Sequence, residues 1–169
     1  MTTFMFTTSI PVFKQMLNSL STILAKAEAY ADEKKIEPNV LLEARLFPDM
    51  FPLKRQVQIA ADFAKGVSAR LAGVEVPAYD DNEQTFSELQ ARITQTLEFI
   101  ESLKPEQFEG SETREIVLRP GTPKEKILAG QSYLLSYGLP QFFFHITTAY
   151  AILRSNGLNV GKGDFMGKY

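Results

Sequence analysis

Four segments of the chain carry core-type residues in alternating steps of three and four, and this spacing limits the folds open to it. Such steps place side chains on one face of an α-helix. Four helices with one apolar face each bury those faces by packing together. The sequence therefore predicts an all-α protein, an antiparallel four-helix bundle, in which the 169 residues form one domain, 1–169. The four lines are Phe13, Leu17, Leu20, Leu24, Ala27 and Ala31; Leu53, Val57, Ala60, Ala64, Val67 and Leu71; Phe86, Leu89, Ile93, Thr96, Ile100 and Leu103; and Leu139, Phe142, Ile146, Ala149 and Leu153.

Capping signals indicate where each helix begins and ends. Proline fits the first turn, where its missing N–H costs nothing, and glycine often follows the last turn. The box Thr85-Phe-Ser-Glu88 is the clearest signal, because each of its outer side chains caps the backbone of the other. The expected helices run from about 10 to 35, 52 to 72, 85 to 105 and 140 to 156.

The segments between the first three helices are broken by prolines. We expect a short helical turn at Val40–Leu46 and an ordered, extended loop at Phe47–Pro52, because a residue before proline avoids the helical region. Asp49 lies between the prolines of that loop, as a cap or a pocket wall. The later connection, Val76–Asn82, is polar and predicts turns.

A small β-hairpin is expected before the last helix. Its strands, Glu115–Arg119 and Lys124–Leu128, flank the turn sequence Pro-Gly-Thr-Pro. Its basic side chains are expected to form a solvated edge that discourages pairing with other chains, and an anionic-ligand site is the alternative. These side chains are Arg114, Arg119, Lys124 and Lys126.

Two shorter segments flank the last helix. Gln131–Tyr137 predicts a helical turn, in which Tyr133 and Tyr137 either line a cleft or simply pack. After the last helix, Phe165 and Met166 are expected to dock on the bundle, unless the glycine-rich tail is mobile.

Composition excludes several classes of protein. The formal net charge is -2 and no long basic run exists, so we expect no nucleic-acid partner. No apolar run approaches the roughly 20 residues of a membrane span. The N-terminus lacks the features of a signal peptide, so we expect a cytoplasmic protein. The absence of cysteine excludes disulfides, thiolate nucleophiles and thiolate metal ligands.

The last helix contains the only histidine of the chain, His145. It lies on a line beside the core face, so it should be largely buried. It is then either a core residue whose ring nitrogens bind Gln141, Gln56 or a tyrosine, or an acid or base beside a pocket, since histidine titrates near neutral pH.

A metal site is hard to assemble from these residues. A Zn²⁺, Ni²⁺ or Fe²⁺ site normally needs three or more imidazole, thiolate or carboxylate ligands. Gln56 points toward the interior but is a poor ligand, and Asp49 reaches in only if its loop folds over the bundle. Asp62 should face solvent or a neighbouring subunit. We therefore expect no tightly bound metal, with Zn²⁺ or Ni²⁺ at His145 and a carboxylate as the alternative.

Three consecutive aromatic residues precede the histidine. Phe142, Phe143 and Phe144 differ by about 100° around a helix and cannot all face one core. At least one should reach the hairpin or a partner subunit, which favours a homodimer.

The motifs of the last helix resemble a known family. The ending Leu153-Arg154-x-x-Gly157, with a histidine nine residues before its arginine, is similar to the fourth helix of the DinB/YfiT-like superfamily. Three motifs look like a domain-of-unknown-function subfamily within it. They are Leu139-Pro-x-Phe-x-Phe-His145, Asp49-Met-Phe-Pro-Leu53 and Arg70-Leu-Ala-Gly73.

The resemblance implies a DinB-like four-helix bundle and a place for a site. In metal-binding members of the superfamily, two histidines four apart on the last helix and one on the second helix bind a divalent metal. His145 matches the second histidine of that pair, Gln141 stands where the first would be, and the second helix has no histidine.

Two functional hypotheses follow. In the first, the protein binds a small ligand or a partner in a pocket near His145, formed with Gln141, Gln56 and Asp49, without the three-histidine metal site of the family. In the second, it is a metal-dependent enzyme, transferase-like as in the superfamily, with an atypical site of His145 and a carboxylate.

Overall fold

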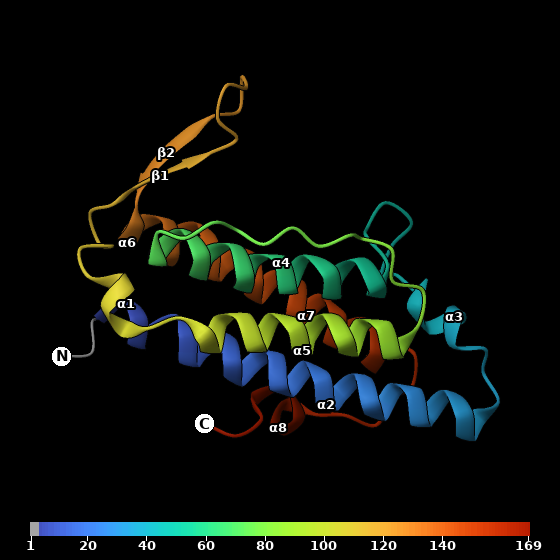
Figure 1. The fold of residues 1–169 in the computed structure, drawn as a ribbon. Coiled ribbons are helices and arrows are strands. Elements are labelled where there is room, and N and C mark those ends of the chain that lie inside the picture. Colours follow the sequence, from blue (N-terminus) through green and yellow to red (C-terminus); the bar gives the residue numbers. More distant parts are fainter. Residues whose placement is uncertain (1–3) are drawn as a thin grey trace.

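A computed structural model describes residues 4–169, so the first three residues of the expected domain 1–169 lie outside the described part. Within it, four long helices form the predicted bundle (Figure 1): α2 (Ile10–Lys34), α4 (Leu53–Ala72), α5 (Phe86–Ser102) and α7 (Leu139–Ser155). The four predicted lines are buried between these helices, except for Leu139, which is partly buried. The shorter elements are α1 (Phe4–Thr7), α3 (Pro38–Leu42), the 3₁₀ turn η1 (Pro105–Phe108), the strands β1 (Glu115–Leu118) and β2 (Lys126–Ala129), α6 (Gly130–Ser132), the π-helical turn η2 (Tyr133–Gly138) and α8 (Lys162–Met166).

The capping signals act as expected at most helix ends. Glu88 N–H donates to the Thr85 hydroxyl, and the Glu88 carboxylate accepts from Thr85 N–H, so the capping box is complete. Gly73 ends α4 in the left-handed region, at φ 71°. Helix α5 ends at Ser102 and not at Pro105, because Leu103 leaves the helical region and is buried in the core.

The direction of the helices differs from a simple up-and-down bundle. Figure 1 shows α2 and α7 running one way and α4 and α5 the other, so the neighbours α4 and α5 are parallel. The connection 73–85 makes this possible by returning along the length of α4, without helix or strand. Helix α4 has 20 residues and is about 30 Å long, which an extended chain of this length spans. The turns expected at Val76–Asn82 are therefore wrong.

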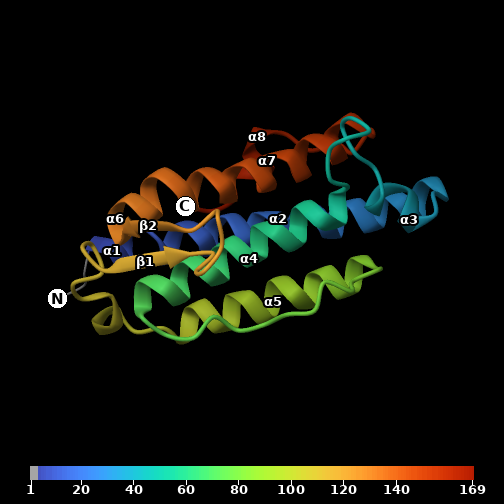
Figure 2. The ribbon, with the colours of Figure 1, turned by 90° about the horizontal axis from the view of Figure 1, so that it is seen from above.

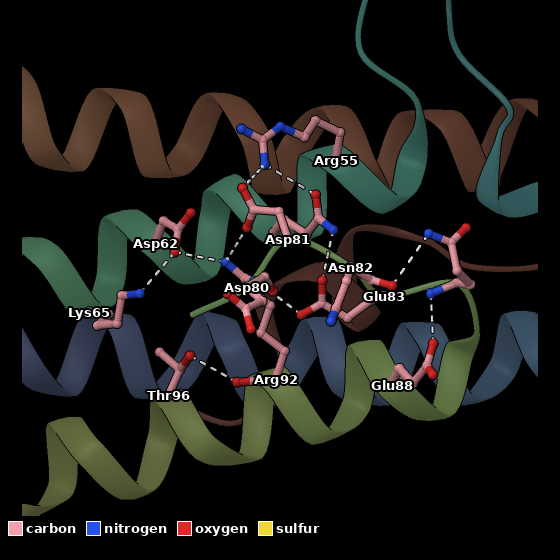
Figure 3. A network of polar contacts seen from close by, with 12 residues as sticks. Arg55, Asp62, Lys65, Asp80, Asp81, Asn82, Glu83, Glu88, Arg92 and Thr96 are labelled. Carbon is pink, nitrogen blue, oxygen red and sulfur yellow. Dashed lines mark hydrogen bonds and ion pairs between the residues drawn. The ribbon is translucent and has the colours of Figure 1, made fainter. Parts of the chain in front are cut away.

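A buried arginine on α5 holds this connection in place (Figure 3). The Arg92 side chain is 1% exposed, and its Nη1 donates to the Glu83 carboxylate at 2.8 Å and to the Asp80 carbonyl at 3.1 Å. Its Nη2 donates to Asp62 at 2.8 Å and to Asp81 at 2.9 Å. Burial lowers the pKa of the guanidinium, but Glu83 and Asp62 outweigh burial and hold that pKa above its usual value.

Side chains of α4 complete the network from the other side. Arg55 pairs with Asp81 at 2.6 Å, and Gln58 donates to Glu83 at 2.8 Å. Lys65 lies 3.6 Å above the centre of the Tyr79 ring, where a cation is attracted to the aromatic face. The segment 73–85 is thus fixed to both helices that it joins.

The hairpin and the start of the last helix lie at one end of the bundle. The strands are antiparallel, with Ile116 opposite Leu128, and Figure 1 and Figure 2 show the hairpin rising from the end of the bundle where α6 lies. Arg114, expected at a solvated edge, instead donates to the Leu71 carbonyl at the end of α4. Elements α6 and η2 lead directly into α7, so Pro140 follows a wide π-helical turn and does not open a separate helix.

The loops near α3 correct two expectations. The short helix runs over Pro38–Leu42 and not Val40–Leu46, because Pro38 occupies its first turn. The loop Phe47–Pro52 is turned and not extended, since Met50 N–H donates to the Phe47 carbonyl at 3.0 Å. A proline in the second position of a β-turn is favoured, and Pro48 takes it.

The tail docks on the bundle as expected. Lys26 pairs with Asp164 at 2.6 Å, and the Gln15 amide donates to the Met166 carbonyl at 2.8 Å. The Phe165 ring packs edge-on against Tyr150 at 5.7 Å. Helix α8 therefore covers part of α2.

We predict that Arg92→Leu lowers the free energy of unfolding by about 3 kcal/mol, because breaking a buried ion pair leaves its carboxylate partners uncompensated. Arg154→Leu, which removes an exposed arginine from the last turn of α7, should cost less than about 1 kcal/mol. Urea denaturation of the three proteins measures both values. Equal stability of the two variants would contradict a central role for Arg92.

Candidate ligand-binding site

Two of the residues singled out in the sequence meet at the seam between α4 and α7, the interface along which these two helices pack. The Nδ1 atom of His145 lies 2.7 Å from the Oε1 atom of Gln56. Both side chains are buried, with exposures of 8% and 2%. Among the described residues, only Gln56 is hydrogen-bonded to His145.

The hydrogen bonds of Gln56 set the protonation of the imidazole ring. The Gln56 amide nitrogen donates to the Phe51 carbonyl at 3.1 Å, so its oxygen faces His145 and must accept. His145 therefore carries its proton on Nδ1 and keeps a lone pair on Nε2. Burial lowers the pKa of His145, and the positive charge of Arg55 lowers it further, which favours the neutral ring.

Aromatic rings surround this pair. Phe63 of α4 stacks on the imidazole, with ring centres 6.0 Å apart and planes 13° apart. Phe144 meets the imidazole edge-on at 5.1 Å and is itself 56% exposed. Phe142 is fully buried, so the prediction that the three phenylalanines face different directions is confirmed.

A line of contacting aromatic rings connects His145 to a pocket. Phe63 lies 5.9 Å from Tyr137, and Tyr137 lies 5.8 Å from Tyr133, centre to centre. Beside these rings is a pocket of 260 Å³ between α4, η2 and the end of β1. Its walls are Asp62, Phe63, Val67, Arg70, Leu118, Arg119, Tyr133 and Tyr137. Phe63 thus belongs both to the histidine site and to the pocket.

Polar groups of the pocket come from different elements. The Arg70 guanidinium donates to the Tyr133 hydroxyl at 3.3 Å. Burial raises the pKa of Tyr133 although Arg70 opposes this, so the phenol stays protonated. Arg119 enters from the end of β1 with φ at 51°, a left-handed conformation that is uncommon for a residue other than glycine.

Three sequence-predicted residues lie apart from the histidine pair. Gln141 is half-buried and lines a separate hollow with Ser136, Tyr137, Pro140 and Phe144. Asp49 is exposed in the β-turn of its loop and is neither a helix cap nor a wall of the pockets described. Asp62 keeps 37% of its side chain exposed and is paired with Arg92 and Lys65 at 2.8 and 3.1 Å.

The residues around His145 do not fit a three-ligand metal centre. No group of three or more histidine, aspartate and glutamate side chains able to hold a metal occurs in residues 4–169. Gln56 Oε1 already accepts a hydrogen bond from the ring. Zn²⁺ and Ni²⁺ prefer nitrogen, sulfur and carboxylate ligands, of which this site offers a single imidazole nitrogen.

Comparison with known proteins places the chain in a family. A family model described as a domain of unknown function, DUF1993, matches residues 5–166. The chain belongs to the DUF1993 family. A crystal structure of a DinB family member from Shewanella denitrificans is similar to it, with 42% identity and a TM-score of 0.91 over 97% of this chain and 92% of that one. The predicted DinB-like resemblance is therefore confirmed. No curated protein matches the chain.

In residues 4–169 of this DUF1993 protein, no helix is both long enough and apolar enough to cross a bilayer.

Sequence reasoning found the histidine pair but missed most of the pocket. Tyr133 and Tyr137 were recognised as possible cleft residues, and Arg119 as a possible anion contact. Phe63 and Arg70 were not, although they lie seven residues apart on α4, which is about two helical turns. A charged and an aromatic residue seven apart on one helix face were the available signal.

We predict that protonation of His145 destabilises the folded protein. Because the folded pKa lies below the unfolded value of about 6.5, the unfolded chain takes up the proton first as the pH falls. Stability should be lost as the pH drops through 6.5 and should level off below the folded pKa. NMR titration of the single histidine reads that pKa directly, and urea denaturation between pH 7.5 and 5 reads the stability. His145→Gln should show a smaller loss; an identical loss would contradict the prediction.

Proposed function

We propose that this protein binds a small organic ligand in the pocket between α4, η2 and the end of β1, next to His145. The observation that carries the proposal is the shared wall, because Phe63 stacks on His145 with one face and lines the pocket as well. Binding pockets are typically concave and apolar, with a few convergent polar groups. This pocket combines Tyr137, Phe63 and Val67 with the charged ends of Arg70 and Arg119.

In this proposal His145 positions the pocket wall and does not touch the ligand. The hydrogen bond from Nδ1 to Gln56 holds the imidazole in one plane. The stacked Phe63 ring, in turn, is held against Tyr137. The neutral, fixed imidazole thus holds the rings of Phe63 and Tyr137 in place.

We predict that Tyr137→Ala weakens ligand binding at least fivefold, because it removes a pocket wall. The probes are 2-naphthoate and the uncharged 2-naphthamide, followed through the ring signals of His145 by NMR. Tyr150→Ala is the matched control, since Tyr150 is also a half-buried tyrosine but contacts Phe165 on the other side of α7. At least one probe should bind the wild type saturably. Failure of both probes to bind would refute the proposed function.

A second candidate is a metal-dependent, transferase-like enzyme, favoured by one observation. A metal-ligating histidine usually donates its other ring N–H to a fixed acceptor. His145 does so toward Gln56, and its Nε2 lone pair remains available. This candidate needs a carboxylate beside the ring. The exposed Asp49 and the twice-paired Asp62 do not favour it.

Elemental mass spectrometry separates the two candidates. The wild type is incubated with Zn²⁺ or Ni²⁺ and then desalted. We predict that it retains less than roughly 0.1 equivalent of metal per chain, because one neutral imidazole binds a metal weakly. His145→Ala should give the same value. About one metal per wild-type chain, lost in His145→Ala, would support the enzyme instead.

We also propose that the partner of this protein is a second copy of the chain. Phe144 and Phe51 are 56% and 54% exposed; the Phe144 ring contacts His145, and the Phe51 carbonyl accepts a hydrogen bond from Gln56. Large exposed aromatic residues are typical of interfaces.

Light scattering after size exclusion tests the dimer. The wild type should be dimeric at micromolar concentration, and Phe144→Glu should be monomeric, because a charge would be buried without a partner. Val40→Glu is the control, since Val40 is 60% exposed on α3. A monomeric wild type at all concentrations tested would contradict the proposal.

A further inference from the structure

We infer that the ligand of this pocket is a small organic anion, whose acidic group binds Arg70 and Arg119 while its apolar body lies against Phe63 and Tyr137. The inference rests on the proposed function and adds the chemical class of the ligand. The notion of an anion at the hairpin, which the sequence left as an alternative, is supported here by the lining of the pocket.

The charges of the pocket walls do not balance. Arg70 donates to the Tyr133 hydroxyl, a neutral group, and forms no ion pair among the described residues. Arg119 is likewise without an ion-pair partner in residues 4–169. The one acidic wall, Asp62, is compensated by Arg92 and Lys65 at 2.8 and 3.1 Å. Two arginines without ion-pair partners among the described residues therefore line the same 260 Å³ space.

The backbone and its neighbours fix the approach of both arginines. Arg70 lies back over α4 against Gly66, where an added Cβ would be only 2.7 Å from its Nη1 atom. The left-handed Arg119 is held by Thr122, whose N–H and hydroxyl donate to the Arg119 carbonyl at 3.3 and 2.9 Å. Conformations of this kind cost free energy and persist where the surroundings enforce them.

The guanidinium groups determine which acidic groups fit. Arginine presents a planar fork of donors that matches a carboxylate, phosphate or sulfonate oxygen pair. Besides Asp62 and Tyr133, the rest of the wall is formed by Val67 and Leu118 and the rings of Phe63 and Tyr137. The pocket volume of 260 Å³ lies just below the range of about 300–1,000 Å³ for drug-sized ligands, so the body of the anion must be compact.

The test compares two molecules of the same shape that differ in charge. NMR titration measures the affinity of 2-naphthoate and 2-naphthamide for the wild type, Arg119→Gln and Lys124→Gln. Arg119 is exposed, so its replacement should leave the fold intact. Lys124 carries the same charge on the same hairpin but does not line the pocket, which makes it the matched control. Arg70→Gln provides a second pocket variant.

The inference expects a definite pattern of affinities. The wild type should bind 2-naphthoate at least fivefold more tightly than 2-naphthamide, and this preference should shrink as salt rises from 50 to 500 mM. Arg119→Gln should lose the preference without weakening 2-naphthamide, whereas Lys124→Gln should keep it.

Two other results would overturn the inference in distinguishable ways. Equal affinity of the wild type for both probes, weakened by Tyr137→Ala, would leave the proposed function standing and remove the anion preference. Equal effects of Arg119→Gln and Lys124→Gln would show only a general attraction to a positive hairpin. If neither probe binds, the proposed function itself is refuted.

Discussion

The buried guanidinium of Arg92 is the interaction on which the arrangement of the helices depends. Its four acceptors lie in the connection 73–85 and in α4. They hold this connection, which has no helix or strand, along the bundle. Burying a charge costs several kcal/mol per ion, which is offset only because three carboxylates and a carbonyl meet it. This anchored connection lets α4 and α5 lie parallel.

The direction of α4 then decides which side chains meet at the seam with α7. With α4 and α7 running in opposite directions, Gln56 lies beside His145 and Phe63 stacks on it. Farther along the same seam, Tyr137 and Tyr133 continue the line of rings to the pocket. The histidine and the pocket are thus joined by one line of aromatic rings, with Phe63 common to both.

The family relationship establishes the fold, and the contacts of His145 bear on its proposed role. The chain belongs to the DUF1993 family and is similar to a DinB family member over nearly all of its length. The fold of that family member is retained, and within it the His145 imidazole is hydrogen-bonded to the Gln56 amide. An amide oxygen accepts a hydrogen bond from the ring but is a poor ligand for Zn²⁺ or Ni²⁺, so this pair fits the proposed positioning role better than the alternative metal centre.

The sequence by itself determined the four helices, their apolar faces and the capping box, because helix periodicity and capping act over three to seven neighbouring residues. It also determined that His145 would be buried, and it named Gln56 among its neighbours. Only the tertiary structure decided that α4 and α5 run parallel, since that depends on Arg92 contacting Asp62 and the connection 73–85. For the same reason it alone brought Arg70 and Arg119 to one pocket. Contacts between residues distant in the sequence depend on how whole helices are placed. The spacing of apolar residues within one helix does not specify that placement.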